Sequence, residues 1–254
     1  MTCTQAILSL LLISPCSDEG GPAMDLAIAE ALANPARPES DRVKDALRRP
    51  DQVLAFFEIS PGMTVLDLFS GGGYYTEILS GTVGPDGRVV AHNNTAYINY
   101  AASEIEPRFS DGHLANVDRV TMEASELTFA PASFDAALLI LTWHDFYYVD
   151  PENGWPAVDE PALTSVLCEA MKPGAVLGVV DHVAAEGSDV RETAQNLHRI
   201  DPARIKADLA DSCFEFVAEA NFLRTSTDDY SKPMFDPEVR GKTDRVVYKF
   251  RRKA

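Results

Sequence analysis

Three short segments of the chain carry histidine and aspartate side chains suited to moving protons. Imidazole has an ordinary pKa near neutrality, so it can accept or donate a proton under physiological conditions. We expect His144 to be the general base of an active site, with Asp145, His182 and His198 assisting it. The three segments are Thr142–Tyr148 (TWHDFYY), Asp181-His182 and His198–Asp201 (HRID).

Aromatic residues accompany the first of these segments and allow two interpretations. Trp143, Tyr147 and Tyr148 could wall a pocket for a flat or apolar molecule, or could pack against the helix that follows. We expect the HRID segment to lie on a later helix that passes over the same edge of the sheet. There, Arg199 and Asp201 could instead form a simple surface ion pair.

A glycine-rich turn, within Val65–Thr76 (VLDLFSGGGYYT), joins an apolar strand to a helix. Glycine lacks a Cβ atom, so the backbone can approach a ligand closely there. The first turn of a helix also offers free N–H groups. Ligands of open α/β sheets bind beyond the carboxyl ends of the strands. This turn therefore predicts a ligand-binding site at that edge of the sheet.

A nicotinamide cofactor is one candidate for this turn, although it fits poorly. The G-x-G-x-x-G fingerprint is met at Gly71 and Gly73, but Thr76 occupies the third glycine position. The acidic residue that should follow about 20 positions later is missing, because the next strand runs into Asn93. An oxidoreductase therefore stays an alternative, as does a non-catalytic binding protein that has kept the fold.

The glycine turn resembles more closely the first motif of class I S-adenosylmethionine-dependent methyltransferases, V-L-D-L-G-x-G-x-G, with Phe69 in place of the first glycine. The similarity covers roughly residues 50 to 254. The segments GGGYYTE, WHDFYY, HRID and GKTDR also resemble a family of bacterial methyltransferases, often exported, with no established substrate class. Further segments resemble the later motifs of class I methyltransferases and follow in the same order, at Val83–Val90, Glu123-Ala124, Phe134–Ala136 and Met171–Gly174.

This resemblance implies S-adenosylmethionine as the cofactor and suggests which residues bind it. Asp67 and the glycine backbone would hold the methionine end, and Glu123 would face the adenine amino group. Asn93 would replace the acidic residue that usually binds both ribose hydroxyls, and its amide can still donate and accept hydrogen bonds. The expected cofactor-binding residues are Asp67, Gly71, Gly72, Gly73, Asn93, Glu123 and Ala124.

A divalent cation is a further alternative, because the chain is similar in places to catechol-type O-methyltransferases. Those enzymes bind a metal after the fourth and fifth strands, where this chain has Asp145, Asp181 and His182. The two carboxylates suit magnesium, whereas the histidine suits zinc or iron better. Our expectation is nevertheless a site without a metal.

Seven apolar runs predict the strands that would position these groups. Several are continuously apolar, as is typical of strands buried on both faces of a parallel sheet. They alternate with helical stretches, which indicates a doubly wound sheet. We expect a Rossmann-like α/β fold with a seven-stranded, mostly parallel sheet whose last strand is antiparallel, and a long loop at Phe222–Thr243 that could act as a lid. The runs are Thr64–Phe69, Arg88–His92, Arg119–Met122, Phe134–Leu141, Ala175–Asp181, Phe214–Ala220 and Arg245–Phe250.

The chain before the sheet divides near residue 20. Ala6–Ser14 (AILSLLLIS) is an apolar run of signal-peptide length, too short to span a bilayer, and LISPC at Cys16 loosely resembles a lipoprotein processing site. We expect residues 1–20 to be a signal and the protein to be periplasmic or exported, with the cytoplasm as the alternative. Residues 21–254 should form one domain, with a helical cap over 21–60 and the Rossmann-like core over 61–254. Export would separate the enzyme from the cytosol, where the cofactor is made.

The charge balance argues against a nucleic-acid substrate. The chain has 39 acidic and 22 basic residues, giving a formal net charge of −17, and only its C-terminal tail is clearly basic. Nucleic-acid binding depends on lysine and arginine side chains that neutralise phosphates. We therefore expect a small-molecule methyl acceptor rather than a nucleic acid. As a separate point, no segment is long and apolar enough to be transmembrane.

None of the four cysteines lies at a spacing typical of a metal site. Cys168 falls in an apolar helical stretch, and Cys213 comes just before a predicted strand. We expect both to be small buried residues rather than metal ligands or a disulfide pair.

Overall fold

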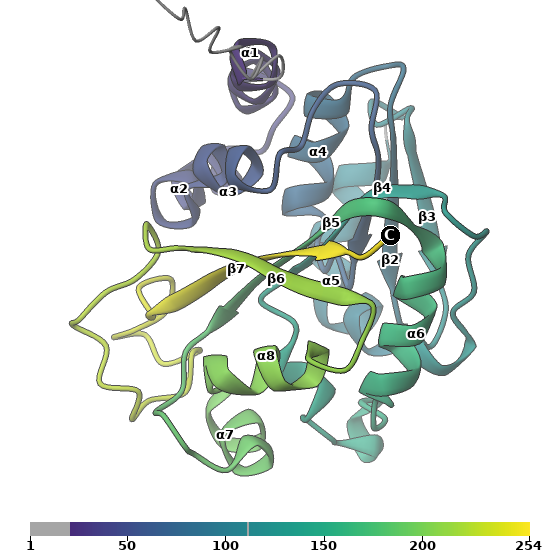
Figure 1. The fold of residues 1–254 in the computed structure, drawn as a ribbon. Helices are drawn as coiled ribbons and strands as arrows, with labels where there is room; N and C mark the ends of the chain where they lie inside the picture. Colours follow the sequence, from purple (N-terminus) through teal and green to yellow (C-terminus); the bar gives the residue numbers. More distant parts are fainter. Residues whose placement is uncertain (1–20, 111) are drawn as a thin grey trace, which may run out of the picture.

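The computed structural model describes residues 21–110 and 112–254 (Figure 1). The expected signal segment, residues 1–20, lies outside the described residues. Among the residues described, no helix combines the length and the apolar character needed to cross a membrane.

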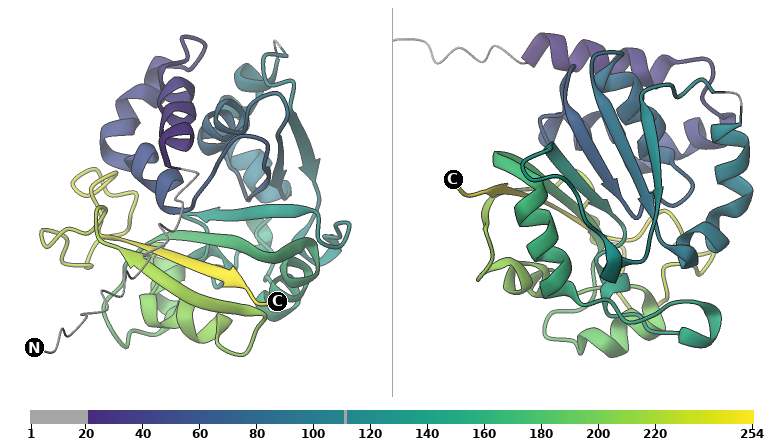
Figure 2. Two further views of the ribbon diagram at one scale, coloured as in Figure 1. Left: turned by 45° about the horizontal axis from the view of Figure 1, so that its top comes forward. Right: turned by 90° about the vertical axis from the view of Figure 1, so that its right-hand side faces the viewer.

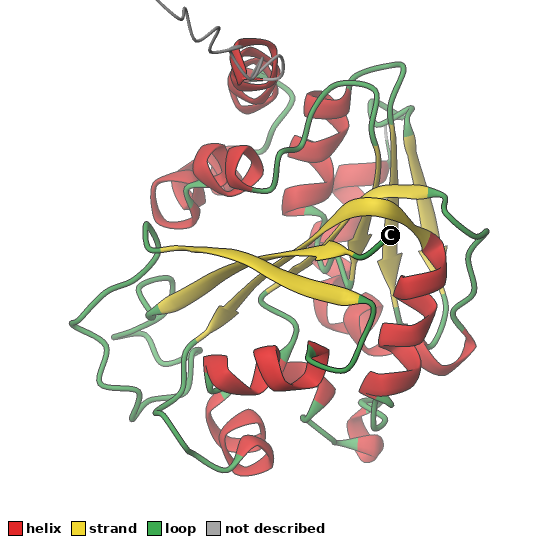
Figure 3. Cartoon of the chain, in the orientation of Figure 1, coloured by secondary structure: helices red, strands yellow, loops and turns green. Residues whose placement is uncertain are grey.

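A seven-stranded sheet forms the centre of the molecule, with the strand order β3-β2-β1-β4-β5-β7-β6 (Figures 1 and 3). Strands β1 to β5 run parallel, and β7 lies antiparallel between β5 and β6. This order confirms the predicted doubly wound sheet with an antiparallel last strand. The strands are β1 (Thr64–Leu68), β2 (Arg88–Asn93), β3 (Val117–Thr121), β4 (Phe134–Ile140), β5 (Met171–His182), β6 (Phe214–Ala220) and β7 (Arg245–Arg252).

All seven predicted runs form strands, and the main difference lies at the start of β5. This strand begins at Met171 rather than at Ala175, because Met171 already pairs with Phe134 before a register shift in the ladder. The polar Lys172-Pro173-Gly174 turn had suggested a later start. The difference lies at the amino end of the strand, far from the edge where ligands bind.

Helices cover both faces of the sheet (Figure 2). Before the sheet come α1 (Gly21–Ala33), α2 (Glu39–Arg48) and α3 (Pro50–Phe56), and α1 packs against α4 (Tyr74–Val83). Apolar residues of α1, α3 and α4 form a core with one face of the sheet. The other face is covered by residues of α6 (Glu160–Ala170) and α8 (Pro202–Leu209). The remaining helices are α5 (Thr95–Phe109), α7 (Val190–Leu197) and the 3-10 turns η1 (Ala124–Glu126), η2 (His144–Phe146) and η3 (Pro151–Asn153).

Cys168 and Cys213 form a disulfide, so our expectation of two unpaired buried cysteines is wrong. Cys168 lies on α6, and Cys213 directly precedes β6. The two residues are 45 positions apart in the sequence. Their pairing depends on the packing of α6 beside the end of α8, which no local sequence pattern reveals.

Candidate active site

The glycine turn leaves β1 at the point where the sheet order reverses direction between β1 and β4. Phe69, Gly71 and Gly73 all have positive φ angles, of 55°, 56° and 80°. Among the described residues, and apart from Gly71 and its two chain neighbours, no atom lies within 4 Å of the position that a Cβ on Gly71 would take, so this side of the turn is open. At Gly73, by contrast, a Cβ would lie 2.7 Å from Cδ of Arg108. The turn thus needs glycine for its backbone angles and, at Gly73, for space.

Asn93, at the end of β2, holds this turn through both ends of its amide. Its Oδ1 accepts a hydrogen bond from the Gly71 N–H and its Nδ2 donates one to the Gly71 carbonyl, each at 2.9 Å. An amide keeps one more donor hydrogen and one more lone pair for a ligand. Asn93 therefore stabilises the conformation of the glycine turn. Its expected contact with the ribose stays a prediction.

Asp67 lies beneath the turn and is almost fully buried. Its Oδ2 accepts a hydrogen bond from the Thr76 hydroxyl at 2.6 Å. Burial raises the pKa of the Asp67 carboxyl to about 6, and this effect outweighs the hydrogen bond from Thr76, which by itself lowers the pKa. Asp67 thus connects β1 to the first turn of α4, and its expected role in cofactor binding stays a prediction.

Two buried oxygen atoms mark the carboxyl ends of β3 and β4. Glu123 Oε1 accepts a hydrogen bond from the Thr95 N–H at 3.1 Å. Within residues 21–110 and 112–254, neither Glu123 Oε2 nor Thr142 Oγ1 has a hydrogen-bond partner, although both atoms are buried. Ala124 begins the turn η1 directly after Glu123. A buried polar atom without a partner is costly unless a ligand or water supplies one, so these atoms fit a polar ligand along this edge.

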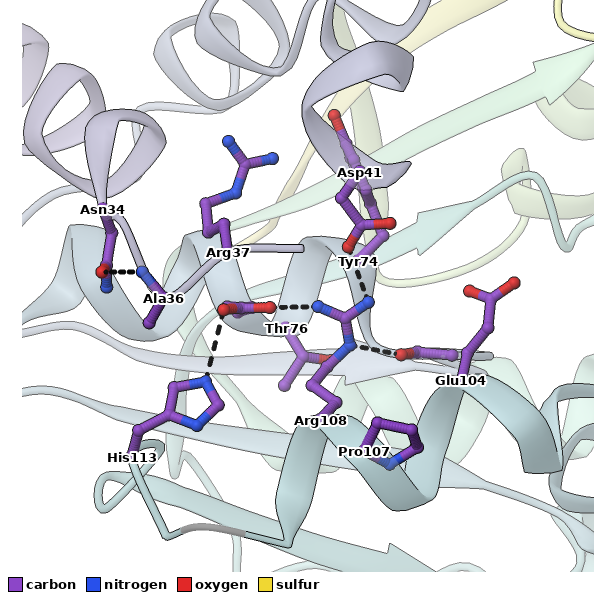
Figure 4. A network of polar contacts seen from close by, with 12 residues as sticks. Asn34, Ala36, Arg37, Asp41, Tyr74, Thr76, Glu104, Pro107, Arg108 and His113 are labelled. Atoms are coloured by element: carbon purple, nitrogen blue, oxygen red, sulfur yellow. Dashed lines mark hydrogen bonds and ion pairs between the residues drawn. The ribbon is translucent and has the colours of Figure 1, made fainter. Parts of the chain in front are cut away.

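Arg108 fixes the glycine turn from the side of α5 (Figure 4). Its guanidinium donates to the Gly72 carbonyl, to Glu77 on α4, and to Asp41 on α2 at 2.6 Å. The side chains of Arg108, Asp41 and Glu77 are each at most 3% exposed. One buried cation thereby ties three helices to the turn.

His144, Asp145 and His198 come together beyond the carboxyl end of β4, as we expected from the sequence. The distance from His144 Nε2 to Asp145 Oδ1 is 3.2 Å, and that from His198 Nδ1 to the same oxygen is 3.6 Å. Tyr97 donates its hydroxyl to Asp145 Oδ2. We call His144, Asp145 and His198 the His–Asp–His cluster.

Asp181, at the end of β5, fixes His144 from behind. Its Oδ1 lies 2.7 Å from His144 Nδ1, and its Oδ2 accepts a hydrogen bond from the His144 N–H at 2.8 Å. Burial favours the neutral ring, but the carboxylates of Asp145 and Asp181 outweigh it and raise the pKa of His144 to about 10. Burial likewise opposes ionisation of Asp145, yet charged His144 outweighs it and holds the pKa of Asp145 well below its usual value. In this arrangement His144 is a cation between two carboxylates, which is a poor general base at neutral pH.

His182 lies behind the cluster. Its Nδ1 is 2.6 Å from the Thr243 hydroxyl, and its ring centroid is 6.0 Å from that of His144. Burial, together with the nearby charge of His144, lowers the pKa of His182 well below its usual value. The His182 side chain thus contacts the segment just before β7. Its expected role in assisting the general base stays a prediction.

A cavity of about 230 Å³ opens beside the His–Asp–His cluster. Aromatic residues dominate its wall, and they come from α5, from the segment after β4 and from the loop before β7. Tyr97 also stacks on Phe69 of the glycine turn, with ring centroids 5.3 Å apart, so the cavity adjoins the turn. The lining residues are Tyr97, Tyr100, Leu141, His144, Asp145, Tyr148, Trp155, His198, Met234 and Phe235.

Only one of the three aromatic residues considered for this wall lines it. Tyr148 does so, and its ring lies 4.7 Å from that of His198. Trp143 and Tyr147 turn away, because both donate hydrogen bonds to Asp208 of α8, at 2.9 and 2.8 Å. These two residues pack against the helical layer, which was the alternative interpretation.

The HRID segment does not lie within a helix. His198 ends α7 with a positive φ of 50°, and Asp201 accepts a hydrogen bond from the Ala203 N–H at the start of α8. Arg199 is fully buried and pairs with Asp228 at 2.8 Å, so the proposed surface ion pair with Asp201 is wrong. Arg199 also donates to the Lys232 carbonyl at 2.9 Å. It therefore anchors the loop that carries two cavity residues.

Several cavity residues carry no chemical signal in the sequence. Tyr97 and Tyr100 look like ordinary helix residues, and Met234 and Phe235 lie in a polar loop. The expected loop between β6 and β7 is confirmed, and Figure 1 shows it at the left, coloured yellow-green. Only the fold brings this loop beside η2, so sequence reasoning had no means to find these residues.

Comparisons with known proteins agree with this architecture. The model of the protein-L-isoaspartate(D-aspartate) O-methyltransferase family matches residues 46–122, which include the glycine turn. A SAM-dependent methyltransferase from Aquifex aeolicus is 22% identical with a TM-score of 0.56, over 89% of this chain and 97% of its own. A putative methyltransferase from Haloferax volcanii, solved with the Trm112 activator, is 14% identical with a TM-score of 0.56, over 91% and 98%. Among curated proteins, none matches the sequence.

The strand order and the glycine turn are those of the class I S-adenosylmethionine-dependent methyltransferase fold, and the family match over residues 46–122 agrees with this fold. The family match and the shared fold support a methyltransferase that uses S-adenosylmethionine as the methyl donor. The fold alone does not fix the reaction, since the [4+2]-cyclase SpnF is 17% identical with a TM-score of 0.54, over 92% of this chain and 95% of its own. The acceptor must therefore be argued from the site.

Proposed function

We propose that this protein transfers the methyl group of S-adenosylmethionine to a small molecule held in the aromatic cavity. The observation that carries the proposal is the position of this cavity, whose Tyr97 stacks on Phe69 of the glycine turn and whose wall contains the His–Asp–His cluster. A volume of about 230 Å³ suits a small acceptor rather than a polymer. The net charge of −17 also disfavours a nucleic acid.

The cofactor would lie along the edge formed by the ends of β1, β2 and β3. Gly71 leaves open space above the turn, and the unpartnered Oε2 of Glu123, judged over the described residues, offers an acceptor for an amino group or a hydroxyl. The glycine backbone and Asp67 would surround the methionine end, and Asn93 and Ala124 would lie on the adenosine side. When bound, the cofactor supplies an activated methyl group, and the protein holds the acceptor in line with it.

The His–Asp–His cluster would orient the nucleophilic atom of the acceptor. Asp145 and His198 face the cavity, and His144 holds Asp145 in place. His182 would assist from behind by fixing the end of β5. In this scheme His198 receives the acceptor's proton, rather than His144, which two carboxylates keep charged.

We also propose that the protein works in an oxidising compartment, as an exported protein would. The disulfide between Cys168 and Cys213 supports this, because disulfides persist in such compartments and are rare in the cytosol. A count of free thiols in the native protein tests this proposal. Free thiols at Cys168 and Cys213 in protein isolated without reductant would contradict it.

Calorimetric titration with S-adenosylmethionine and S-adenosylhomocysteine, with NADH as the control, tests the cofactor. We expect both adenosylated ligands to bind and NADH not to bind. Glu123→Ala should weaken binding roughly tenfold to a hundredfold, as expected for the loss of a hydrogen bond to a charged group. Glu126→Ala is the matched control, since this exposed residue lies three positions later on η1. Absence of binding to folded wild-type protein would contradict the proposal.

A further inference from the structure

The His–Asp–His cluster has a second property, which is the spacing of its ligand atoms. The candidate donor atoms of His144, Asp145 and His198 all lie within 4.8 Å of one another. Zinc lies about 2.0–2.2 Å from nitrogen and oxygen ligands, so two ligands on one ion are about 3–3.5 Å apart. The distances to Asp145 Oδ1, 3.2 Å from His144 Nε2 and 3.6 Å from His198 Nδ1, are already close to this range.

The side chains behind the cluster match those that support metal ligands. A metal-binding histidine usually donates its other ring N–H to a carboxylate, which fixes the orientation of the ring. Here Asp181 Oδ1 lies 2.7 Å from Nδ1 of His144, leaving Nε2 directed toward Asp145. The second oxygen of Asp145 is also held, by the Tyr97 hydroxyl. An ion at this position would displace the proton on His144 Nε2, as metal binding to histidine requires, and the three inner atoms would then face that ion.

His198 is held for this purpose by its backbone and by its neighbours. Its φ of 50° is uncommon for a residue with a side chain, and such angles often mark functional positions. Tyr148 and Phe235 lie against the ring, with centroids 4.7 and 4.8 Å away. The ring is thereby directed toward Asp145 at the wall of the cavity.

We propose that His144 Nε2, Asp145 Oδ1 and His198 Nδ1 bind one divalent transition-metal ion of the zinc or iron class. Two imidazoles and one carboxylate suit these ions better than magnesium, which prefers oxygen ligands. Three protein ligands leave coordination positions open, as in catalytic metal sites. Because all three residues line the cavity, the open positions face a bound small molecule.

This ligand set differs from the one we considered from the sequence. Asp181 and His182 follow β5 as expected, but Asp181 holds His144 and His182 turns to Thr243. The third ligand is instead His198, which comes from the end of α7. The inference uses the same cavity as the proposed methyl transfer but does not depend on that activity.

Titration of chelator-treated, full-length protein with Co²⁺, followed by its visible absorption, tests the site directly. We expect one Co²⁺ per chain, displaced by Zn²⁺ and not by Mg²⁺. His198→Asn should weaken binding strongly, and asparagine tolerates the positive φ at this position, so the variant should fold. Tyr97→Phe, which removes only a supporting hydroxyl, should weaken binding by about tenfold.

His113→Asn is the matched control, because the side chain of His113 is 23% exposed and that of His198 is 20% exposed. It should bind Co²⁺ as the wild type does. No Co²⁺ on folded wild-type protein, or binding that His198→Asn leaves unchanged, would overturn the metal site. Titration of the same samples with S-adenosylmethionine separates this result from a failure of the proposed function.

Discussion

At the scale of single residues, the burial of Asp67 lowers the stability of the fold at neutral pH, and we expect its charge to serve cofactor binding. It is buried, and its pKa of about 6 lies above the ordinary value of 3.8. The unfolded chain therefore loses this proton more readily, and the ionised group opposes folding above about pH 4. One pKa unit corresponds to about 1.4 kcal/mol, so the opposition reaches about 3 kcal/mol at pH 7.5. This cost to stability is consistent with the expected role of the Asp67 charge in cofactor binding, which stays a prediction.

We predict that Asp67→Asn raises the free energy of unfolding at pH 7.5 by up to about 3 kcal/mol and weakens cofactor binding. Asparagine keeps the shape and an acceptor for the Thr76 hydroxyl, but it carries no charge. The gain should fall to about half at pH 5, where the group is largely protonated in the folded state. Urea unfolding at both pH values measures this. Asp86→Asn, at an exposed turn, should change stability by less than about 0.5 kcal/mol.

A gain in stability that is the same at both pH values would contradict this account of Asp67. It would mean that the substitution acts through packing rather than through the charge. Retained affinity for S-adenosylmethionine would separately exclude Asp67 from the binding of the methionine end.

At the scale of elements, the buried side chain of Arg108 connects the glycine turn to the surrounding helices. Its guanidinium joins α5 to α4 and α2 and donates to the Gly72 carbonyl. Removing one partner of a buried ion pair leaves the other charge uncompensated, which costs about 3–5 kcal/mol. The same cation fixes the glycine turn, so we expect changes at Arg108 to affect both stability and cofactor binding.

We predict that Arg108→Met lowers the free energy of unfolding by about 3–5 kcal/mol and weakens the binding of S-adenosylmethionine. Arg88→Met is the matched control, because Arg88 pairs with Asp118 at the surface, with both side chains more than half exposed. That change should cost less than about 1 kcal/mol. Urea unfolding and calorimetry on both variants measure the two effects. Equal losses in the two variants would contradict a special role for Arg108.

The elements also show how far the sequence can predict this molecule. Continuous apolar runs such as AALLIL in β4 identify buried parallel strands, and the order of strands and helices then places the carboxyl ends together. That reasoning predicted His144, Asp145 and His198 near one edge. It did not predict which atoms face one another, because a side chain such as Trp143 turns toward Asp208 on a helix far away in sequence.

At the scale of the whole molecule, the disulfide is the feature that sequence reasoning missed most clearly. Cys168 lies in a helix and Cys213 before a strand, and each resembles a small buried apolar residue. Their meeting depends on how α6 and the α8–β6 connection pack on one face of the sheet. Contacts between distant parts of the chain leave no local pattern, whereas strands and turns do.

We predict that this disulfide stabilises the fold by about 2–4 kcal/mol, because it closes a long loop in the unfolded chain. For a domain of this size, that corresponds to a fall in Tm of roughly 4–16 °C on reduction. The double variant Cys168→Ser, Cys213→Ser should have a lower Tm than the oxidised wild type, and reductant should not change it. Because this variant lacks the disulfide, it is the matched control for side effects of the reductant. If reductant leaves the Tm of the wild type unchanged, or lowers that of the double variant equally, the bond does not support the fold. The proposal of an oxidising compartment would then lose its structural basis.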